Sequence, residues 1–238
     1  MTRFMTQFMT RGALALLAGL AACTNLGDES SATLKTLAAI QAAAGRAVAG
    51  DETEPRPPLT RAVLDTIDGE FIQAEIEKSG SSAFMYISAE RTGAAAGAEG
   101  GRLLVWRTEN DVSLTLRDGV LVETRGLGND MISAEGGPAL AAVRSRVAGQ
   151  GSKRQVYSAL DNKSVAMNFV CAVDDLGPET IVIVERRHAT RHLRETCELQ
   201  GGTVVNDYWV DSRGPTVWQS RQWGGPNIGY VQFRQLTP

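Results

Sequence analysis

Aromatic side chains gather near the C-terminal end of the sequence. The group consists of Tyr208, Trp209, Trp218, Arg221 and Trp223, and its spacing places the members on neighbouring strands. Aromatic faces beside Arg and Gln side chains are suited to stacking on sugar rings. The group is therefore a candidate glycan-binding site. The alternative interpretation is that the same aromatics close one end of a sheet core.

Three acidic side chains, Asp174, Asp175 and Glu185, are candidates for the hydrolysis of a glycosidic bond. That reaction needs two carboxyl groups about 5 to 9 Å apart across the sugar. Acidic residues in turns are more often solvated than catalytic. The sequence also contains no Gly-Xaa-Ser-Xaa-Gly motif and no phosphate-binding loop. We therefore predict no enzymatic activity and no cofactor.

The two histidines, His188 and His192, are candidates for binding a metal ion. On a helix, a spacing of four residues would place both imidazoles on one face. Here they lie at a predicted strand junction in an Arg-rich stretch, where the two rings do not converge. The sequence therefore predicts a solvated turn and no metal site.

The N-terminus combines a basic start with a short apolar run. Arg3 and Arg11 accompany a run of apolar residues much shorter than the roughly 20 that a membrane-spanning helix needs. The run ends in Leu-Ala-Ala-Cys, which has the form of a lipobox. We therefore predict a lipoprotein signal peptide over residues 1–22 and a diacylglycerol anchor on Cys23; the alternative is an uncleaved helix with an incidental cysteine. Because Thr24 follows, and not the Asp of an inner-membrane retention signal, we expect an anchor in the outer membrane, with the protein facing the periplasm.

Two cysteines remain if Cys23 is acylated, and the envelope is a compartment that oxidises thiols. We predict that Cys171 and Cys197 form a disulfide. Closing a loop of about 27 residues would stabilise the fold by about 3 kcal/mol in the chain-entropy model. The alternative is a pair of buried free thiols, since each cysteine lies in an apolar run.

The composition is that of an ordinary globular protein. Hydrophobic residues make up 43% of the 238 residues and charged residues 21%, which fits neither disorder nor several membrane spans. Without Arg3 and Arg11 the mature chain carries 22 basic and 27 acidic residues. This mildly acidic balance lacks the basic field that attracts phosphate backbones, so nucleic acid is not an expected partner.

The order of the predicted elements changes from helix to strand along the chain. Residues 23–31 are predicted to be a polar tether, and residues 32–48 an Ala-rich helix. A hairpin is predicted over 112–124 with Asp118-Gly119 as its turn, and a second short helix over 138–147. Period-two alternation predicts further strands at 71–77, 83–89, 102–107, 154–160, 164–173, 180–187, 191–199, 203–209, 216–222 and 228–236.

The short turns between these strands favour antiparallel pairing of sequence neighbours. About a dozen strands are too many for a twisted sheet to stay open and flat. The sequence therefore predicts a mainly β fold, a large antiparallel meander sheet curled into a barrel or half-barrel, with the Ala-rich helix packed on or in it. We expect residues 32–238 to form a single β-rich periplasmic domain.

Three motifs carry a resemblance to a known family. They are the Leu-Ala-Ala-Cys box, the stretch 117–127 (RDGVLVETRGL), and Tyr-Trp-Val-Asp at 208–211 with Ser-Arg-Gln-Trp at 220–223. In these motifs the chain resembles the YjbF family of lipoproteins, related to the group 4 capsule lipoproteins. The resemblance covers most of the mature chain. It implies an outer-membrane lipoprotein encoded with exopolysaccharide or capsule export genes, folded as a meandering antiparallel sheet, and no established enzymatic activity.

We therefore expect an outer-membrane-anchored, non-enzymatic lipoprotein that assists the production or export of an exopolysaccharide or capsule. Its partners would be the polysaccharide or proteins of the export machinery. One alternative is a lipid or lipoprotein carrier, because a curled half-barrel with a helix lid also forms a cavity for acyl chains. A third hypothesis is a glycan-trimming enzyme.

Overall fold

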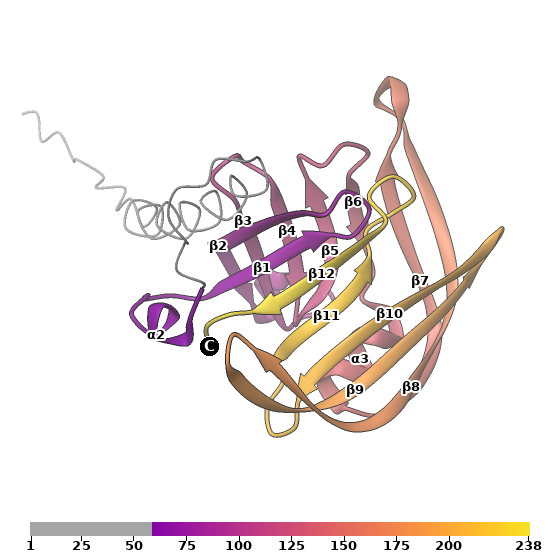
Figure 1. Cartoon of the computed structure of the whole chain (residues 1–238). Coiled ribbons are helices and arrows are strands. Elements are labelled where there is room, and N and C mark those ends of the chain that lie inside the picture. The colour runs from indigo at the N-terminus through magenta and orange to yellow at the C-terminus, as the bar shows by residue number, and fades with distance from the viewer. Residues whose placement is uncertain (1–58) are drawn as a thin grey trace, which may run out of the picture.

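The computed structural model describes residues 59–238, which form one twelve-stranded antiparallel sheet with two α-helices (Figure 1). The helices are α2 (Arg61–Leu64) and α3 (Gly137–Ser145). The strands are β1 (Phe71–Ile76), β2 (Ser81–Thr92), β3 (Arg102–Arg107), β4 (Ser113–Arg117), β5 (Val120–Arg125), β6 (Met131–Ala134), β7 (Gly149–Ser158), β8 (Ser164–Ile183), β9 (Arg186–Leu199), β10 (Gly202–Asp211), β11 (Val217–Trp223) and β12 (Tyr230–Gln235).

The sheet is a meander in two halves. Its strand order is β5-β4-β3-β2-β1-β12-β11-β10-β9-β8-β7-β6, so the chain runs outward from β1 to β5 and returns from β6 to β12. The first and last strands, β1 and β12, pair antiparallel in the middle. Sequence neighbours pair within each half because short turns join them, which confirms the predicted antiparallel meander.

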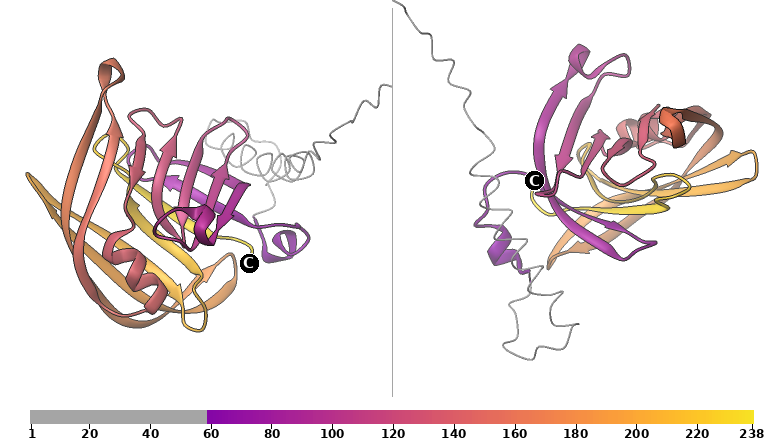
Figure 2. Two further views of the ribbon diagram at one scale, coloured as in Figure 1. Left: turned by 180° about the vertical axis from the view of Figure 1, so that it is seen from behind. Right: turned by 90° about the horizontal axis from the view of Figure 1, so that it is seen from above.

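The two edge strands, β5 and β6, are consecutive in the chain and come together at the loop between them. Met131 N donates to Thr124 Oγ1 at 2.9 Å. The carboxylate of Asp130 accepts from Thr124 Oγ1, Gly126 N and Leu127 N, each at 3.0 Å. These bonds hold the edges side by side, so the sheet nearly closes into a barrel, as predicted (Figure 2).

The inside of the barrel is an apolar core through which the Gln222 side chain makes hydrogen bonds to the opposite side of the sheet. Gln222 of β11 accepts from Leu121 N at 2.8 Å and donates to Gly119 O at 2.7 Å, which ties β11 to the β4–β5 hairpin across the interior. Gly119 has a φ of +86°, and a Cβ there would lie 2.4 Å from Val217 Cγ2, so this turn requires glycine. The largest apolar cluster consists of Ile72, Ala74, Met85, Leu104, Trp106, Leu114, Leu116, Leu121, Met131, Tyr157, Ile228, Val231 and Phe233.

Helix α3 packs against the sheet and confirms the second predicted helix. It has Pro138 in its first turn and ends at Arg146 in the left-handed conformation, one turn after Ala142. Its buried side chains contact a cluster on the inner face of the sheet that includes Leu193 and Tyr208. The apolar stripe of the sequence therefore faces the sheet, as the 3.6-residue period requires.

Helix α2 is a single turn that joins the start of the described chain to its end. Arg61 donates to Val184 O at 3.2 Å, to Ile183 O at 2.9 Å and to Leu236 O at 2.7 Å. Leu64 packs with Phe71 and Leu236 in an apolar cluster outside the barrel interior. The tip of the β8–β9 hairpin is thereby fastened to the C-terminal segment.

Strand β8 differs most from the sequence prediction. We expected two strands, at 164–173 and 180–187, yet one strand runs from Ser164 to Ile183, because a bulge between Asp175 and Gly177 accommodates the irregular stretch between them. The turn lies instead at Val184 and Glu185, both with positive φ. Strand β9 therefore begins at Arg186 and includes both histidines.

Several predicted segments lie outside the described residues. These are the signal peptide at 1–22, the anchor Cys23, the tether at 23–31 and the Ala-rich helix at 32–48. Within residues 59–238, neither α-helix has the length and hydropathy needed to cross a membrane.

Candidate functional site

The structure distributes the C-terminal aromatic group over several environments. Tyr208 is 1% exposed and lies in the cluster beneath α3, where its hydroxyl bonds Gln222 Oε1 at 3.3 Å. Burial raises the pKa of the Tyr208 phenol well above its usual value. Tyr208 therefore offers no surface to a ligand.

Trp218 lies in the apolar cluster around α2, at the mouth of the barrel. Its indole nitrogen donates to Asp211 Oδ2 at 2.8 Å, and its ring packs against His188 at a centroid distance of 3.9 Å. His188 is only 7% exposed. Burial, followed by the charges of Arg61 and Arg186, lowers the pKa of His188. The predicted solvated turn at this histidine is therefore wrong, because β9 continues through His188 and the ring is buried against Trp218.

Trp223 and Arg221 form a second aromatic centre with Tyr230. The rings of Trp223 and Tyr230 meet edge to face at 5.3 Å, and the Arg221 guanidinium lies 3.4 Å from the centre of the Tyr230 ring. Arg221 also donates twice to Glu77, at 2.7 and 2.8 Å, which lowers the pKa of that carboxyl. The cation of Arg221 is thus already paired.

Trp209 is the member of the group that lies in a polar row on the face opposite α3. Cross-strand pairing aligns Gln73, Arg234, Gln219, Trp209 and His192, one from each of the strands β1, β12, β11, β10 and β9. Opposed residues of antiparallel strands point to the same face, and strands lie about 4.8 Å apart, so this Trp209 row extends over about 19 Å. The residues that alternate with it, such as Tyr208 and Leu193, face the core.

Two carboxylates hold Trp209 and His192 in place. Glu179 Oε2 accepts from Trp209 Nε1 at 2.9 Å and lies 3.0 Å from His192 Nδ1. Asp207 Oδ1 lies 2.8 Å from His192 Nε2 and accepts from Arg194 Nε at 2.8 Å. The two rings stack at 4.4 Å with an interplanar angle of 17°. The indole plane is therefore fixed before any ligand arrives.

Arg234 and Gln219 supply open hydrogen-bonding groups beside this ring. They pair directly with each other, and Gln219 pairs with Trp209. Arg234 is exposed and Gln219 half-buried, and neither side chain has a hydrogen bond or ion pair with any residue in 59–238. The row thus presents a guanidinium, an amide and an indole in register, a set that stacks on an apolar ring face and bonds hydroxyl or carboxylate oxygens.

The three candidate catalytic carboxyl groups do not converge. Asp175 accepts from Arg191 at 2.6 Å, and this bond lowers the pKa of the Asp175 carboxyl. Glu185 lies in the β8–β9 turn and accepts from Arg61 N at 3.1 Å. Asp174 is exposed on β8, opposite Arg194 in the β8–β9 register. The two aspartates lie near the middle of β8, whereas Glu185 lies in the turn beyond the end of that strand. The three carboxyl groups therefore do not flank one sugar.

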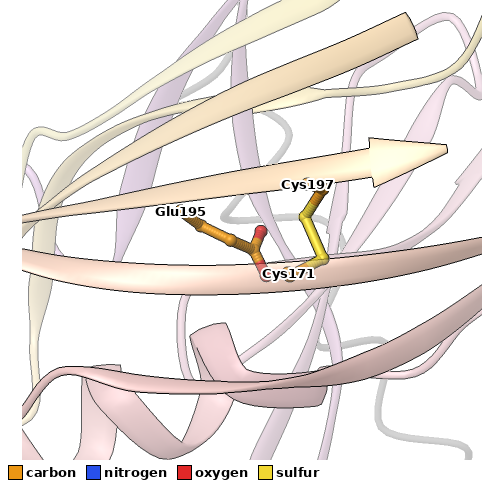
Figure 3. Close-up of side chains that lie close together, drawn as sticks. All are labelled: Cys171, Glu195 and Cys197. Atoms are coloured by element: carbon orange, nitrogen blue, oxygen red, sulfur yellow. A yellow bond between two sulfur atoms is a disulfide. The ribbon is translucent and has the colours of Figure 1, made fainter.

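The expected disulfide between Cys171 and Cys197 is present (Figure 3). The two cysteines and Glu195 are the one group of potential metal ligands found among residues 59–238. Both sulfurs are bonded to each other, so they are not available to a metal. Glu195 is fully buried and accepts from Lys153 Nζ at 2.6 Å and from Asn206 Nδ2 at 2.7 Å.

Sequence reasoning missed the partners of Trp209. His192 was considered only for metal binding, Gln219 was noted only as a neighbour of the aromatics in the sequence, and Glu179 and Arg234 were not considered. Their association depends on the pairing of β12 with β11 and on the bulge in β8. A period-two pattern shows that a residue faces outward, but it does not show which residues on other strands lie beside it.

Comparison with known proteins assigns the chain to a family. The family model for YjbF, described as group 4 capsule polysaccharide lipoprotein gfcB, matches residues 37–236. The crystal structure of the hypothetical lipoprotein YmcC from Escherichia coli has a TM-score of 0.64 with this chain at 18% identity, covering 76% of this chain and 89% of YmcC. That likeness shows a common fold, while no curated protein sequence matches significantly. Because the family model spans most of its length, the chain belongs to the YjbF family of group 4 capsule polysaccharide lipoproteins.

Proposed function

We propose that this protein is a lipid-anchored accessory factor in the production of a capsule or exopolysaccharide, and that the Trp209 row contacts the polymer. The family description supports the role in capsule polysaccharide production. The Trp209 row is the observation that carries the binding step, because it combines a fixed indole with an open amide and an open guanidinium. A sugar ring offers an apolar face for stacking and oxygens for these donors.

The proposed location is the outer membrane, on the periplasmic side. It rests on the lipobox that ends at Cys23 and on Thr24 after it. In that place the domain would meet the polymer on its way to the cell surface, which is how we propose that it assists export, through contact with the polysaccharide or with proteins of the export machinery.

The proposed role is non-enzymatic. Asp207 and Glu179, the carboxylates that hold the Trp209–His192 stack, are both engaged by His192 and by further donors. Carboxylates that hold an aromatic platform in this way position a ligand and do not need to transfer protons. The alternative of a lipid carrier depends on a different feature, the cavity at the mouth of the barrel.

Replacing Cys23 with Ser is expected to release the protein from the outer-membrane fraction and to reduce secreted polysaccharide to the level of a deletion strain. The thiol that carries the diacylglycerol is lost, so the domain is no longer held where the polymer passes. The measurement is secreted polymer and membrane fractionation in a deletion strain that expresses either form, with Thr24→Ser as a control that keeps the lipobox. A deletion strain that secretes a normal amount of polymer would contradict the proposed function.

Replacing Trp209 with Ala is expected to weaken binding of the purified capsular polysaccharide by about fivefold, since loss of one stacked ring is worth on the order of 1 kcal/mol. Arg234→Ala is expected to weaken binding by a smaller factor. Trp209→Phe keeps a ring and should retain most of the affinity. Isothermal titration calorimetry measures the affinity of the wild-type protein and of these three variants for the polymer.

The control for this experiment is Arg187→Ala, which removes an exposed cation of β9 that is not in the Trp209 row. Because Trp209 also packs against the apolar cluster around α2, thermal unfolding of each variant must show a folded protein. If folded Trp209→Ala binds the polymer as tightly as the Arg187→Ala protein, the Trp209 row is not the contact.

A further inference from the structure

A cavity of about 310 Å³ opens at the mouth of the barrel. It lies where β3, the β4–β5 turn, the start of β11 and the C-terminal residues meet, and an adjoining hollow of about 640 Å³ shares Glu70 and Arg102 with it. The mouths of β-barrels are common ligand sites, and this volume is at the lower end of the range of about 300–1,000 Å³ for such pockets. There is room for one small ligand or one chain.

The deeper wall of the cavity is apolar. Ile72, Leu104, Leu116 and Phe233 line it, and all four are buried members of the barrel core. Burial of apolar ligand surface against such a wall contributes about 25 cal/mol per Å². The wall thus favours a hydrocarbon body.

One polar group in this wall lacks a partner. Trp106 lines the cavity and is 1% exposed, and its Nε1 bonds no atom of residues 59–238. A buried donor without an acceptor costs about 1–3 kcal/mol, and native structures rarely contain such an unpaired donor. The cavity therefore suits a ligand that brings an acceptor oxygen to Trp106.

The charged groups at the rim are already paired with one another or with neighbouring residues. Arg102 donates to Glu70 at 2.6 and 3.0 Å and to Glu90 at 2.8 and 3.1 Å. Asp118 accepts from Arg144 Nε and from Arg102 N, each at 2.8 Å. A sugar ring in the cavity would bury several hydroxyl groups against the apolar wall. Among the described lining residues, Trp106 Nε1 is the one buried side-chain donor without a partner, and each unpaired sugar hydroxyl carries a desolvation cost. This count disfavours a glycan.

We propose that the mouth of the barrel binds a single acyl chain, with the hydrocarbon against Leu104, Leu116 and Phe233 and a carboxyl or ester oxygen accepting from Trp106 Nε1. The occupant is thus an acylated molecule with one chain in the cavity. Its polar remainder extends toward Arg102 and Glu70 in the adjoining hollow. This site is separate from the Trp209 row, so a test of acyl-chain binding here does not depend on whether the Trp209 row binds the polymer.

Quenching of tryptophan fluorescence by bromoundecanoate tests the site on the full-length protein. Trp106 and Trp218 line the cavity, whereas Trp209 and Trp223 do not, so saturable quenching of part of the emission is expected. Unbrominated undecanoate should reverse it by competition. Absence of saturable quenching would overturn the proposal.

Two variants place the ligand. Leu104→Phe fills the cavity and is expected to weaken binding at least tenfold, whereas Leu199→Phe, the same change in the cluster around the disulfide, should leave it unaltered. Trp106→Phe keeps an aromatic ring at this position but removes the Nε1 donor, and calorimetry with undecanoate should show about fivefold weaker binding. Equal binding by the Leu104→Phe and wild-type proteins, or displacement of the probe by capsular oligosaccharide, would contradict an acyl-chain site here.

Discussion

Replacing Lys153 with Met is expected to lower the free energy of unfolding by about 3–5 kcal/mol, the cost of leaving a buried charge without its partner. Lys153 and Glu195 are 4% and 0% exposed, and Lys153 Nζ lies 2.6 Å from Glu195 Oε2. The second carboxylate oxygen, Oε1, has no partner among the described residues. Lys153 therefore supplies the counter-charge, and Asn206 Nδ2 adds one hydrogen bond at 2.7 Å. Chemical denaturation with the disulfide intact measures the change.

The double variant Lys153→Met/Glu195→Leu separates loss of the pair from loss of packing. Removing both charges also removes the desolvation cost of each, so the double variant should recover much of the stability that Lys153→Met loses. Arg154→Met is the matched control, because Arg154 is the exposed neighbour of Lys153 on β7 and should change stability by less than about 0.5 kcal/mol. A loss for Lys153→Met no larger than that of Arg154→Met would contradict the role of the ion pair.

Much of the fold follows from local patterns. The hairpin at Asp118-Gly119 appears where the turn residues predict it, and the helix over 138–147 appears as Gly137–Ser145. In both cases the signal is contained within a dozen residues: a turn dipeptide between alternating strands, or a proline followed by an apolar stripe of helical period. Such elements need no information about distant parts of the chain.

The features that sequence patterns did not predict depend on distant contacts. Strand β6, Met131–Ala134, has only four residues and is held by Thr124 and by pairing with β7. The continuation of β8 past Gly177 is maintained by its ladder with β9. A turn signal such as Leu-Gly-Pro is compatible with either a break or a bulge, and tertiary pairing decides between them.

In the candidate site, too, local patterns predict some features and distant contacts determine the others. Aromatic residues in an alternating stretch predict a cluster, and Trp209, Trp218 and Trp223 do lie on adjacent strands. Which face each indole takes depends on the bulge where Val210 pairs with Val217, which takes Trp218 out of register with Trp209. The association of Trp209 with Arg234 depends on β12, whose pairing partners no local pattern identifies.

Replacing both Cys171 and Cys197 with Ala is expected to lower the free energy of unfolding by about 3 kcal/mol, because the cross-link restricts the unfolded chain more than the folded one. The two cysteines are directly opposed on β8 and β9, with Cα atoms 4.0 Å apart and a sequence separation of 26. In the folded state the ladder already holds these strands together, so few contacts are lost when the bond is removed. The effect therefore arises mainly in the unfolded ensemble.

Reductant provides the test that separates this entropic effect from damage to the core. The wild-type protein unfolded in the presence of a thiol reductant should lose the same stability as the double variant, and the double variant should be insensitive to reductant. Because Cys171 and Cys197 are buried with Phe169 and Val204, alanine also removes two sulfur atoms from an apolar cluster, which would add a cavity cost to the variant alone. If the reduced wild-type protein and the double variant lose the same free energy of unfolding, the cross-link is the larger contribution. If the double variant is destabilised but the wild-type protein is unaffected by reductant, then packing around the two sulfurs, and not closure of the loop, stabilises this part of the sheet.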